Sequence, residues 1–214
     1  MGSYLEDTIP FDDSGPAVDV TAAKADLRRE IKVRIAAMTP EERAQASSLL
    51  TERVRALPEF AAAGRVLLYS ALPDEADVGA LMDDLIARGR EVLLPVSDTA
   101  TREIKVVSIS DPVRELRDGA YGILEPLGGM PLEDPGAIDF VIVPGRAFDA
   151  DGRRLGRGKG YYDGFLSRLR PFGAGGPMKL GVGFSCQLAD AVPTVPRDVS
   201  MDAVATERSI IRPD

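Results

Sequence analysis

The chain has 214 residues, of which 44% are hydrophobic and 28% are charged, and it carries a formal net charge of −8. This length suits one domain with a sizeable core, the acidic balance opposes non-specific binding to nucleic acid, and no apolar run approaches the roughly 20 residues that span a membrane. The sequence has no histidine and a single cysteine, Cys186, so histidine-based hydrolase triads, zinc sites and internal disulfides are not expected.

The N-terminal segment combines Asp, Gly, Ser and Pro without hydrophobic periodicity, which predicts a flexible tail over residues 1–20. It has no basic start and no apolar stretch, so it is typical of neither a secretory signal nor a mitochondrial presequence. We therefore expect a single domain over residues 21–214 and a cytoplasmic location. We also expect a monomer that binds neither membrane nor nucleic acid.

Two helices are predicted next. Apolar residues recur with helical spacing from Thr21 to Met38. Residues 39–42, Thr-Pro-Glu-Glu, supply an N-cap, a proline at the first helical position and a capping-box glutamate, so a second helix begins there. On the first helix, Lys24 and Arg28 are four residues apart and share a face. Spacing alone more often indicates a solvated face than a ligand site.

The pattern after residue 65 predicts alternating strands and helices. The expected strands are 66–69, 92–96, 104–109, 140–143 and 180–184, and the expected helices are 78–88 and 165–169. This alternation indicates an α/β fold with a mostly parallel sheet flanked by helices on both sides. In such folds, ligands bind beyond the carboxyl ends of the strands.

The segment between the strand at 140–143 and the helix at 165–169 has the composition of a phosphate-binding loop. Its glycines and cations are Arg154, Gly156, Arg157, Gly158, Lys159 and Gly160. Glycines permit positive φ and a close backbone approach, while cations and a helix N-terminus favour bound phosphate. The loop matches neither the Walker pattern nor the Rossmann fingerprint. A solvated flexible loop is the simpler alternative, and the alternation of glycines with cations disfavours it.

The string Arg-Leu-Gly-Arg-Gly-Lys-Gly-Tyr-Tyr-Asp at 154–163, preceded by Val-Pro-Gly and Phe-Asp within 143–149, resembles the signature of the 5-formyltetrahydrofolate cyclo-ligase family. Segments 24–28, 69–77, 121–126 and 195–204 are similar to the family in order and spacing. The resemblance covers roughly residues 23 to 208. It implies a three-layer Rossmann-like fold of the NagB/RpiA/CoA-transferase type.

The resemblance also implies an activity. Members convert 5-formyltetrahydrofolate to 5,10-methenyltetrahydrofolate with ATP and Mg²⁺, releasing ADP and phosphate through an iminium phosphate, in folate one-carbon metabolism. Such chemistry requires positioning and charge neutralisation more than a histidine base, which agrees with a chain that lacks histidine.

The resemblance assigns roles to individual residues. Arg157 and Lys159 would be catalytic, and Asp163 and Asp198 would hold magnesium. The ATP-binding residues would be Lys24, Arg28, Arg154, Leu155, Gly156, Arg157, Gly158, Lys159, Gly160, Tyr161 and Tyr162. The folate-binding residues would be Ser70, Glu75 and Tyr161.

Simpler interpretations stay open for several of these residues. Asp163 can stabilise the start of the following helix through the helix dipole, Glu75 can be an exposed loop residue, and one of the two tyrosines can belong to the core. Asp202 can support the local turn. The chain also departs from the family pattern, because Val78 stands in place of a threonine and Arg197 in place of a frequent histidine.

Two other functions are compatible with the phosphate loop. One is an ATP-using enzyme with a different acceptor, which would hydrolyse ATP without using 5-formyltetrahydrofolate. The other is a non-catalytic nucleotide- or folate-binding protein, which would bind ligands without turnover. The complete loop and the two aspartates together favour catalysis.

Overall fold

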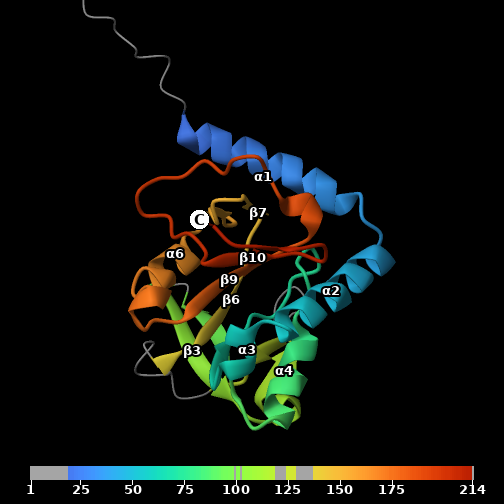
Figure 1. Ribbon diagram of the computed structural model, residues 1–214, viewed down its shortest axis with the longest axis vertical. Helices are drawn as coiled ribbons and strands as arrows, with labels where there is room; N and C mark the ends of the chain where they lie inside the picture. Colours follow the sequence, from blue (N-terminus) through green and yellow to red (C-terminus); the bar gives the residue numbers. More distant parts are fainter. Residues whose placement is uncertain (1–18, 99, 102, 119–123, 129–136, 214) are drawn as a thin grey trace, which may run out of the picture.

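The computed structural model describes residues 19–98, 100–101, 103–118, 124–128 and 137–213, which form one α/β domain (Figure 1). A seven-stranded sheet lies at its centre, in the order β11-β10-β9-β6-β1-β2-β3. Within the described residues, no helix has the length and apolar character needed to cross a membrane. The tail predicted from the sequence lies outside the described residues up to position 18.

The five central strands of the sheet are parallel to one another. They are β1 (Arg65–Leu67), β2 (Glu91–Asp98), β6 (Phe140–Pro144), β9 (Met178–Val182) and β10 (Ala203–Ala205). The edge strands β3 (Glu103–Ile109) and β11 (Ile210–Ile211) pair antiparallel to their neighbours. The prediction of a mostly parallel sheet is therefore confirmed.

The remaining elements are helices and two short strand pairs. The helices are α1 (Val20–Ala36), α2 (Pro40–Arg55), α3 (Pro58–Ala62), α4 (Gly79–Ala87), α5 (Pro112–Glu115) and α6 (Tyr161–Leu166), with 3-10 turns at η3 (Phe172–Ala174) and η4 (Ser185–Gln187). The strand pairs are β4 (Leu116–Asp118) with β5 (Leu124–Pro126), and β7 (Ala147–Phe148) with β8 (Arg154–Leu155).

Three layers follow from the alternation of side chains along the strands. Successive side chains of a strand point to opposite faces of the sheet. In β6, Phe140 and Ile142 join the core formed with α2, α3 and α4, whereas Val141 and Val143 join the core formed with α6. All four side chains are completely buried, which explains why this strand is a continuous apolar run.

The helix ends show which predictions from the sequence are correct. The capping box at the start of α2 is present, with Thr39 Oγ1 accepting from the Glu42 amide at 3.1 Å and the Glu42 carboxylate accepting from the Thr39 amide at 2.8 Å.

The helix predicted at 165–169 is wrong in position, because α6 begins at Tyr161. Gly160 adopts a left-handed conformation (φ 76°) and turns the chain directly from the loop into the helix.

Val78, the residue that departs from the family pattern, is the N-cap of α4 and makes no side-chain capping bond. The preceding residue supplies the cap instead, because Asp77 Oδ1 accepts a hydrogen bond from the Gly79 amide at 2.8 Å. Val78 itself is completely buried. The helix start is thus maintained without the threonine.

The order of the strands creates a crevice between β1 and β6. From β1 the chain continues through α4 to β2 on one side, whereas β6, β9 and β10 succeed one another on the other side. Ligands of open α/β sheets bind at such a switch point, beyond the carboxyl ends of the strands. Helix α1 covers this end of the sheet, where Ile31 and Ile35 pack against Ala147 and Leu155 (Figure 1).

Candidate functional site

A cleft of about 680 Å³ lies at the crevice between β1 and β6. Segments that are far apart in the sequence line it: the chain after β1, strands β2 and β3, the β4–β5 pair, and the glycine-rich loop with the start of α6. The lining residues are Tyr69, Ser70, Leu72, Glu75, Pro95, Val96, Ser97, Ile104, Arg117, Leu124, Glu125, Pro126, Pro144, Arg154, Gly156, Arg157, Lys159, Gly160, Tyr161, Tyr162 and Asp163.

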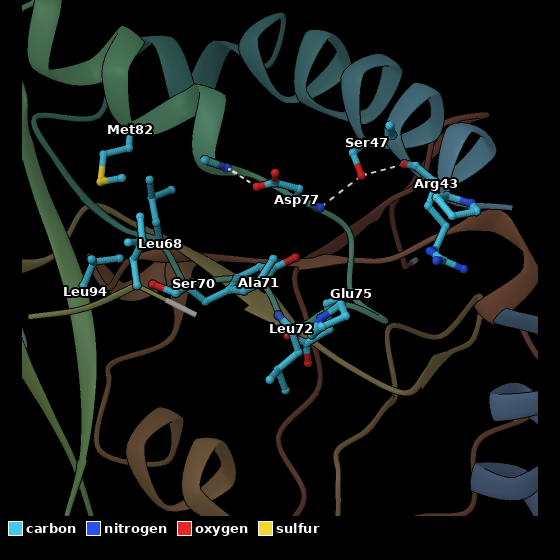
Figure 2. Close-up of a pocket in the computed structure, with 16 residues that line it drawn as sticks. Arg43, Ser47, Leu68, Ser70, Ala71, Leu72, Glu75, Asp77, Met82 and Leu94 are labelled. Atoms are coloured by element: carbon cyan, nitrogen blue, oxygen red, sulfur yellow. Dashed lines mark hydrogen bonds between the residues drawn. The ribbon is translucent and has the colours of Figure 1, made fainter. Parts of the chain in front are cut away.

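A second cavity of about 500 Å³ adjoins the cleft beneath α2 and α4. Figure 2 shows its polar end at Arg43 and Ser47, where Ser47 Oγ accepts a hydrogen bond from the Asp77 amide at 3.0 Å, and its apolar end at Met82. The two cavities share the lining residues Tyr69, Ser70, Leu72, Glu75 and Leu124. Ser70 and Glu75, which the resemblance assigns to folate binding, therefore lie at the junction of the two spaces.

Arg157 connects the glycine-rich loop to the segment after β1. Its Nη2 lies 2.8 Å from Glu75 Oε1 and 2.5 Å from Asp74 Oδ1, and its Nε donates to Glu75 Oε1 at 2.9 Å. Burial alone would raise the pKa of Asp74, but hydrogen bonds from Arg157 and Arg146 outweigh it, and the pKa is lowered. The carboxylate is therefore ionised at neutral pH and attracts both guanidinium groups.

Lys159 lies on the same loop but is not held by any residue that the structure describes. Its side chain is exposed and lines the cleft, and it makes no hydrogen bond or ion pair with any other described residue. The amides of residues 156–160 likewise donate to no other described group. An ammonium group and several free backbone N–H groups are thus available to an anion.

Arg154 is a fixed part of the cleft wall. The residue is 5% exposed, and its guanidinium lies 2.8 Å from Asp163, 3.2 Å from the Pro144 carbonyl oxygen and above the Tyr162 ring at 5.6 Å. Its Nε is buried without a hydrogen-bond partner among the described residues. Leu155, by contrast, directs its side chain into the core with α1, so only its backbone can contact a nucleotide.

Tyr161 and Tyr162 both line the cleft, and both also pack against the core beneath it. Burial raises the pKa of Tyr162, and the negative charge of Glu75 raises it further. The phenol is therefore protonated at neutral pH. The two tyrosines combine the core role and the surface role that the sequence left as alternatives.

The two cations of α1 make contacts with protein groups at and near the loop. Arg28 Nε donates to the Gly156 carbonyl oxygen at 2.9 Å, and Lys24 forms an ion pair with Asp198. Neither cation is among the residues that line the cleft. Burial lowers the pKa of Arg28, partly offset by Asp198. Arg28 thus contacts the loop, and Lys24 contacts an aspartate that the resemblance assigns to the site.

Asp163 and Asp198 are tied to one segment of chain. The Val199 amide donates to Asp163 Oδ1 at 3.4 Å, and the Val195 amide donates to Asp198 Oδ2 at 2.8 Å. Asp163 Oδ2 and Asp198 Oδ1 make no hydrogen bond with other described residues. Within the described part of the chain, no group of three or more His, Cys, Asp or Glu is placed to hold a metal ion. Mg²⁺ often takes one or two carboxylates and completes its shell with phosphate oxygens and water, so the unpartnered oxygens of Asp163 and Asp198 are of the kind of donor that this ion uses.

Three residues to which the sequence assigned no role support the site. Arg146 lies 2.5 Å from Asp74 Oδ2, and the buried Gln187 donates to the carbonyl oxygens of Gly145 and Arg146 at 2.7 and 3.1 Å. Asp74 and Arg146 occur within motifs noted in the sequence, but only the fold makes them neighbours. Asp202 accepts from the Lys179 amide at 2.7 Å, so its role is structural, but it fastens strand β9 rather than a local turn. Residues 121–123 of the resemblance lie outside the described residues.

A family model described as the 5-formyltetrahydrofolate cyclo-ligase family matches residues 20–207. Over 198 residues the chain is 31% identical to a 5-formyltetrahydrofolate cyclo-ligase of Mus musculus, covering 90% of this chain and 98% of the relative. Over 202 residues it is 33% identical to one of Saccharomyces cerevisiae, covering 86% and 94%. It also resembles the NMR structure of Aquifex aeolicus 5,10-methenyltetrahydrofolate synthetase, with a TM-score of 0.75, 34% identity, and coverage of 88% of this chain and 92% of that one.

Proposed function

The chain belongs to the 5-formyltetrahydrofolate cyclo-ligase family, and we propose that it closes the folate ring in the cleft between β1 and β6, using ATP and Mg²⁺. Family membership makes it a ligase that converts 5-formyltetrahydrofolate to 5,10-methenyltetrahydrofolate. The proposal concerns the co-substrate, the metal, the intermediate and the residues that act. Its place in metabolism would be the interconversion of one-carbon folates.

One observation carries the assignment of the site. Lys159 and the free amides of 156–160 line the same cleft as Glu75 and Ser70, so phosphate-binding groups and polar groups suited to a pterin face one space. Phosphoryl transfer requires the donor and the acceptor to be held in line within a few ångströms. A shared cleft meets this requirement.

On the nucleotide side, the loop amides would cradle the phosphates and Lys159 and Arg157 would offset the charge that develops on the transferred group. Arg154 would contribute its positive potential from the wall. Lys24 and Arg28 would support this site through their contacts with Asp198 and the Gly156 carbonyl oxygen.

On the folate side, Glu75 would accept hydrogen bonds from the N–H groups of the pterin. The residue is largely buried, and its side chain is 10% exposed, so its carboxylate acts in a partly desolvated environment where hydrogen bonds to it are strong. Ser70 would offer a hydroxyl at the junction of the two cavities. The ring of Tyr161 would supply a flat surface.

The reaction can be written with all atoms accounted for. The formyl oxygen on N5 attacks the γ-phosphorus of ATP, the bond from phosphorus to the β-phosphate oxygen breaks, and ADP leaves. In the iminium phosphate, N10 attacks the formyl carbon and loses its proton to solvent. The C–O bond then breaks, and phosphate departs with the formyl oxygen.

Asp163 and Asp198 would hold magnesium, each through the carboxylate oxygen that has no protein partner among the described residues. When bound, the ion would neutralise phosphate charge during transfer. Each carboxylate is kept in place by a cation, Arg154 for Asp163 and Lys24 for Asp198. These cations would have to shift or share their carboxylate oxygens when the metal binds.

The proposal is tested with purified protein by following methenyl-folate absorbance and ADP release together, with 5-formyltetrahydrofolate, ATP and Mg²⁺ present and each omitted in turn. We expect product only when all three are present, with one ADP per methenyl folate. ADP release with another acceptor would indicate a different ATP-using enzyme. Ligand binding without turnover would indicate a binding protein, and either result would overturn the proposal.

A further inference from the structure

Asp74 lines neither cavity, yet both of its carboxylate oxygens are engaged beside the cleft. Oδ1 lies 2.5 Å from Arg157 Nη2, and Oδ2 lies 2.5 Å from Arg146 Nη1. The carboxylate thus bridges the guanidinium groups of Arg146, which precedes β7, and Arg157, which follows β8. The segment after β1 is thereby joined to the chain that follows β6.

The backbone of the glycine-rich loop does little to hold Arg157. Although the Gly156 carbonyl oxygen accepts a hydrogen bond from Arg28, Gly158 has a positive φ of 105° and no amide of residues 156–160 donates to another described group. Glycine-flanked backbone of this kind has many accessible conformations. The direction of the Arg157 side chain is therefore set mainly by its own contacts.

Arg146, by contrast, is firmly placed. Its amide donates to the Leu155 carbonyl oxygen at 2.6 Å, and its own carbonyl oxygen accepts from Gln187 Nε2 at 3.1 Å. Gln187 is 1% exposed and the Arg146 side chain is 15% exposed. A residue with these backbone contacts and this burial has few alternative positions, so it can serve as an anchor.

We propose that Asp74 is a positioning residue, which transmits the fixed position of Arg146 to Arg157 and so orients the loop cation for the transferred phosphoryl group. Arg157 uses Nε and Nη2 in its contacts with Asp74 and Glu75, while Nη1 makes no contact with a described residue. That N–H pair remains for a phosphate oxygen. The orientation of Arg157 follows from the geometry, and its catalytic consequence rests on the proposed function.

The substitution Asp74→Asn tests this without removing bulk. The carboxylate gives one oxygen to each guanidinium, whereas asparagine is uncharged and would turn an NH₂ donor toward one of them, so it cannot keep both contacts in their present arrangement. Asp84→Asn is the matched control, because Asp84 on α4 also bridges two arginines, Arg88 at 3.1 Å and Arg55 at 3.7 Å, and lines neither cavity. Circular dichroism and thermal unfolding establish that both variants are folded.

The first measurement is ¹⁵N relaxation of the Arg157 Nε–H group in the unliganded protein, which does not depend on the activity. The order parameter of this group should fall in Asp74→Asn, because the guanidinium loses the carboxylate that joins it to Arg146. Asp84→Asn should leave this order parameter unchanged. Equal order parameters in wild type and Asp74→Asn would overturn the positioning role.

The second measurement is a double-mutant cycle with Arg157→Ala. Asp74→Asn alone should lower kcat about 10- to 100-fold through misplacement of Arg157, and it should have little further effect when Arg157 is already alanine. A loss of the same size in the Arg157→Ala background would show that Asp74 acts independently of Arg157. Absence of activity in wild type would remove the proposed function, while the relaxation measurement would still decide the positioning role.

Discussion

At the scale of single residues, the described cations of the cleft differ in whether a carboxylate holds them. Arg154 and Arg157 each contact carboxylates, whereas Lys159 has no partner among the described residues. A held cation presents a fixed charge and needs little reorganisation, which is the condition for effective electrostatic stabilisation. A free lysine on a glycine-rich loop can follow the phosphate as it moves.

This difference leads to a prediction for Lys159→Ala. We expect kcat to fall by about 10²- to 10³-fold, as when one preorganised donor to a developing anion is removed, while the unfolding midpoint stays unchanged because the side chain is exposed and makes no described contact. Lys32→Ala, an exposed lysine on α1, is the control. Turnover at the wild-type rate in Lys159→Ala would remove this residue from the mechanism.

Tyr69 gives a prediction at alkaline pH. Burial raises the pKa of this tyrosine well above 10.0, and the charges of Glu75 and Asp77 raise it further. Since the folded pKa is above the unfolded one, the stabilisation is fully present below pH 10.0 and is lost as the pH rises through the folded pKa. Wild-type stability should therefore fall steeply above that pH.

Tyr69→Phe should lack this contribution. At pH 7 it should be less stable by about 1 kcal/mol, because the hydroxyl no longer donates to the Ala76 carbonyl oxygen. The difference should shrink or reverse by about pH 11, which urea unfolding at both pH values would measure. A difference that stays constant over this range would show that Tyr69 does not titrate as described.

At the scale of elements, the sequence predicts the long and strongly patterned segments well. The helices α1, α2 and α4 and the strands β1, β2, β3, β6 and β9 were expected within a few residues of their bounds. The short strands β7, β8, β10 and β11, of two or three residues each, were not, because so few residues carry no periodicity. The start of α6 was missed because its first turn contains the tyrosines and aspartate of the loop motif.

The capping box of α2 supplies a stability prediction. Thr39→Ala removes the acceptor for the Glu42 amide and should destabilise the protein by about 1 kcal/mol. For a chain of this size, the midpoint of thermal unfolding should fall by about 2–4 °C. Ser48→Ala, an exposed position within the same helix, should cause almost no change. An equal effect of the two substitutions would contradict a specific role of the cap.

At the scale of the whole molecule, the site is assembled by the strand order. The loop after β6, the segment after β1 and the start of α1 are distant in sequence and meet because β1 and β6 are neighbours. The sequence identified the loop cations and the aspartates through their motif. The ion pairs from Asp74 to Arg146 and Arg157 were not predictable, since they depend on which strands lie side by side.

The boundary of the folded domain gives a further prediction. Helix α1 begins at Val20, and Asp19 Oδ1 accepts from the Thr21 and Ala22 amides at 2.9 and 3.2 Å, so residues 19 and 20 belong to the fold rather than to the tail expected over 1–20. Deleting residues 1–18 should leave turnover and the unfolding midpoint unchanged. Adding Asp19→Ala to this truncation should cost about 1 kcal/mol of stability. A large loss of turnover on deleting 1–18 alone would show that this segment contributes to the site.

In the proposed reaction both substrates react directly with each other in one cleft, and the formyl oxygen of the folate attacks the γ-phosphorus of ATP. The most direct measurement uses 5-formyltetrahydrofolate labelled with ¹⁸O in the formyl group and follows the label by mass spectrometry of the released phosphate. We predict that each phosphate carries one ¹⁸O atom, in amounts equal to the methenyl folate formed. Unlabelled phosphate, formed together with methenyl folate, would contradict direct attack of the formyl oxygen on ATP.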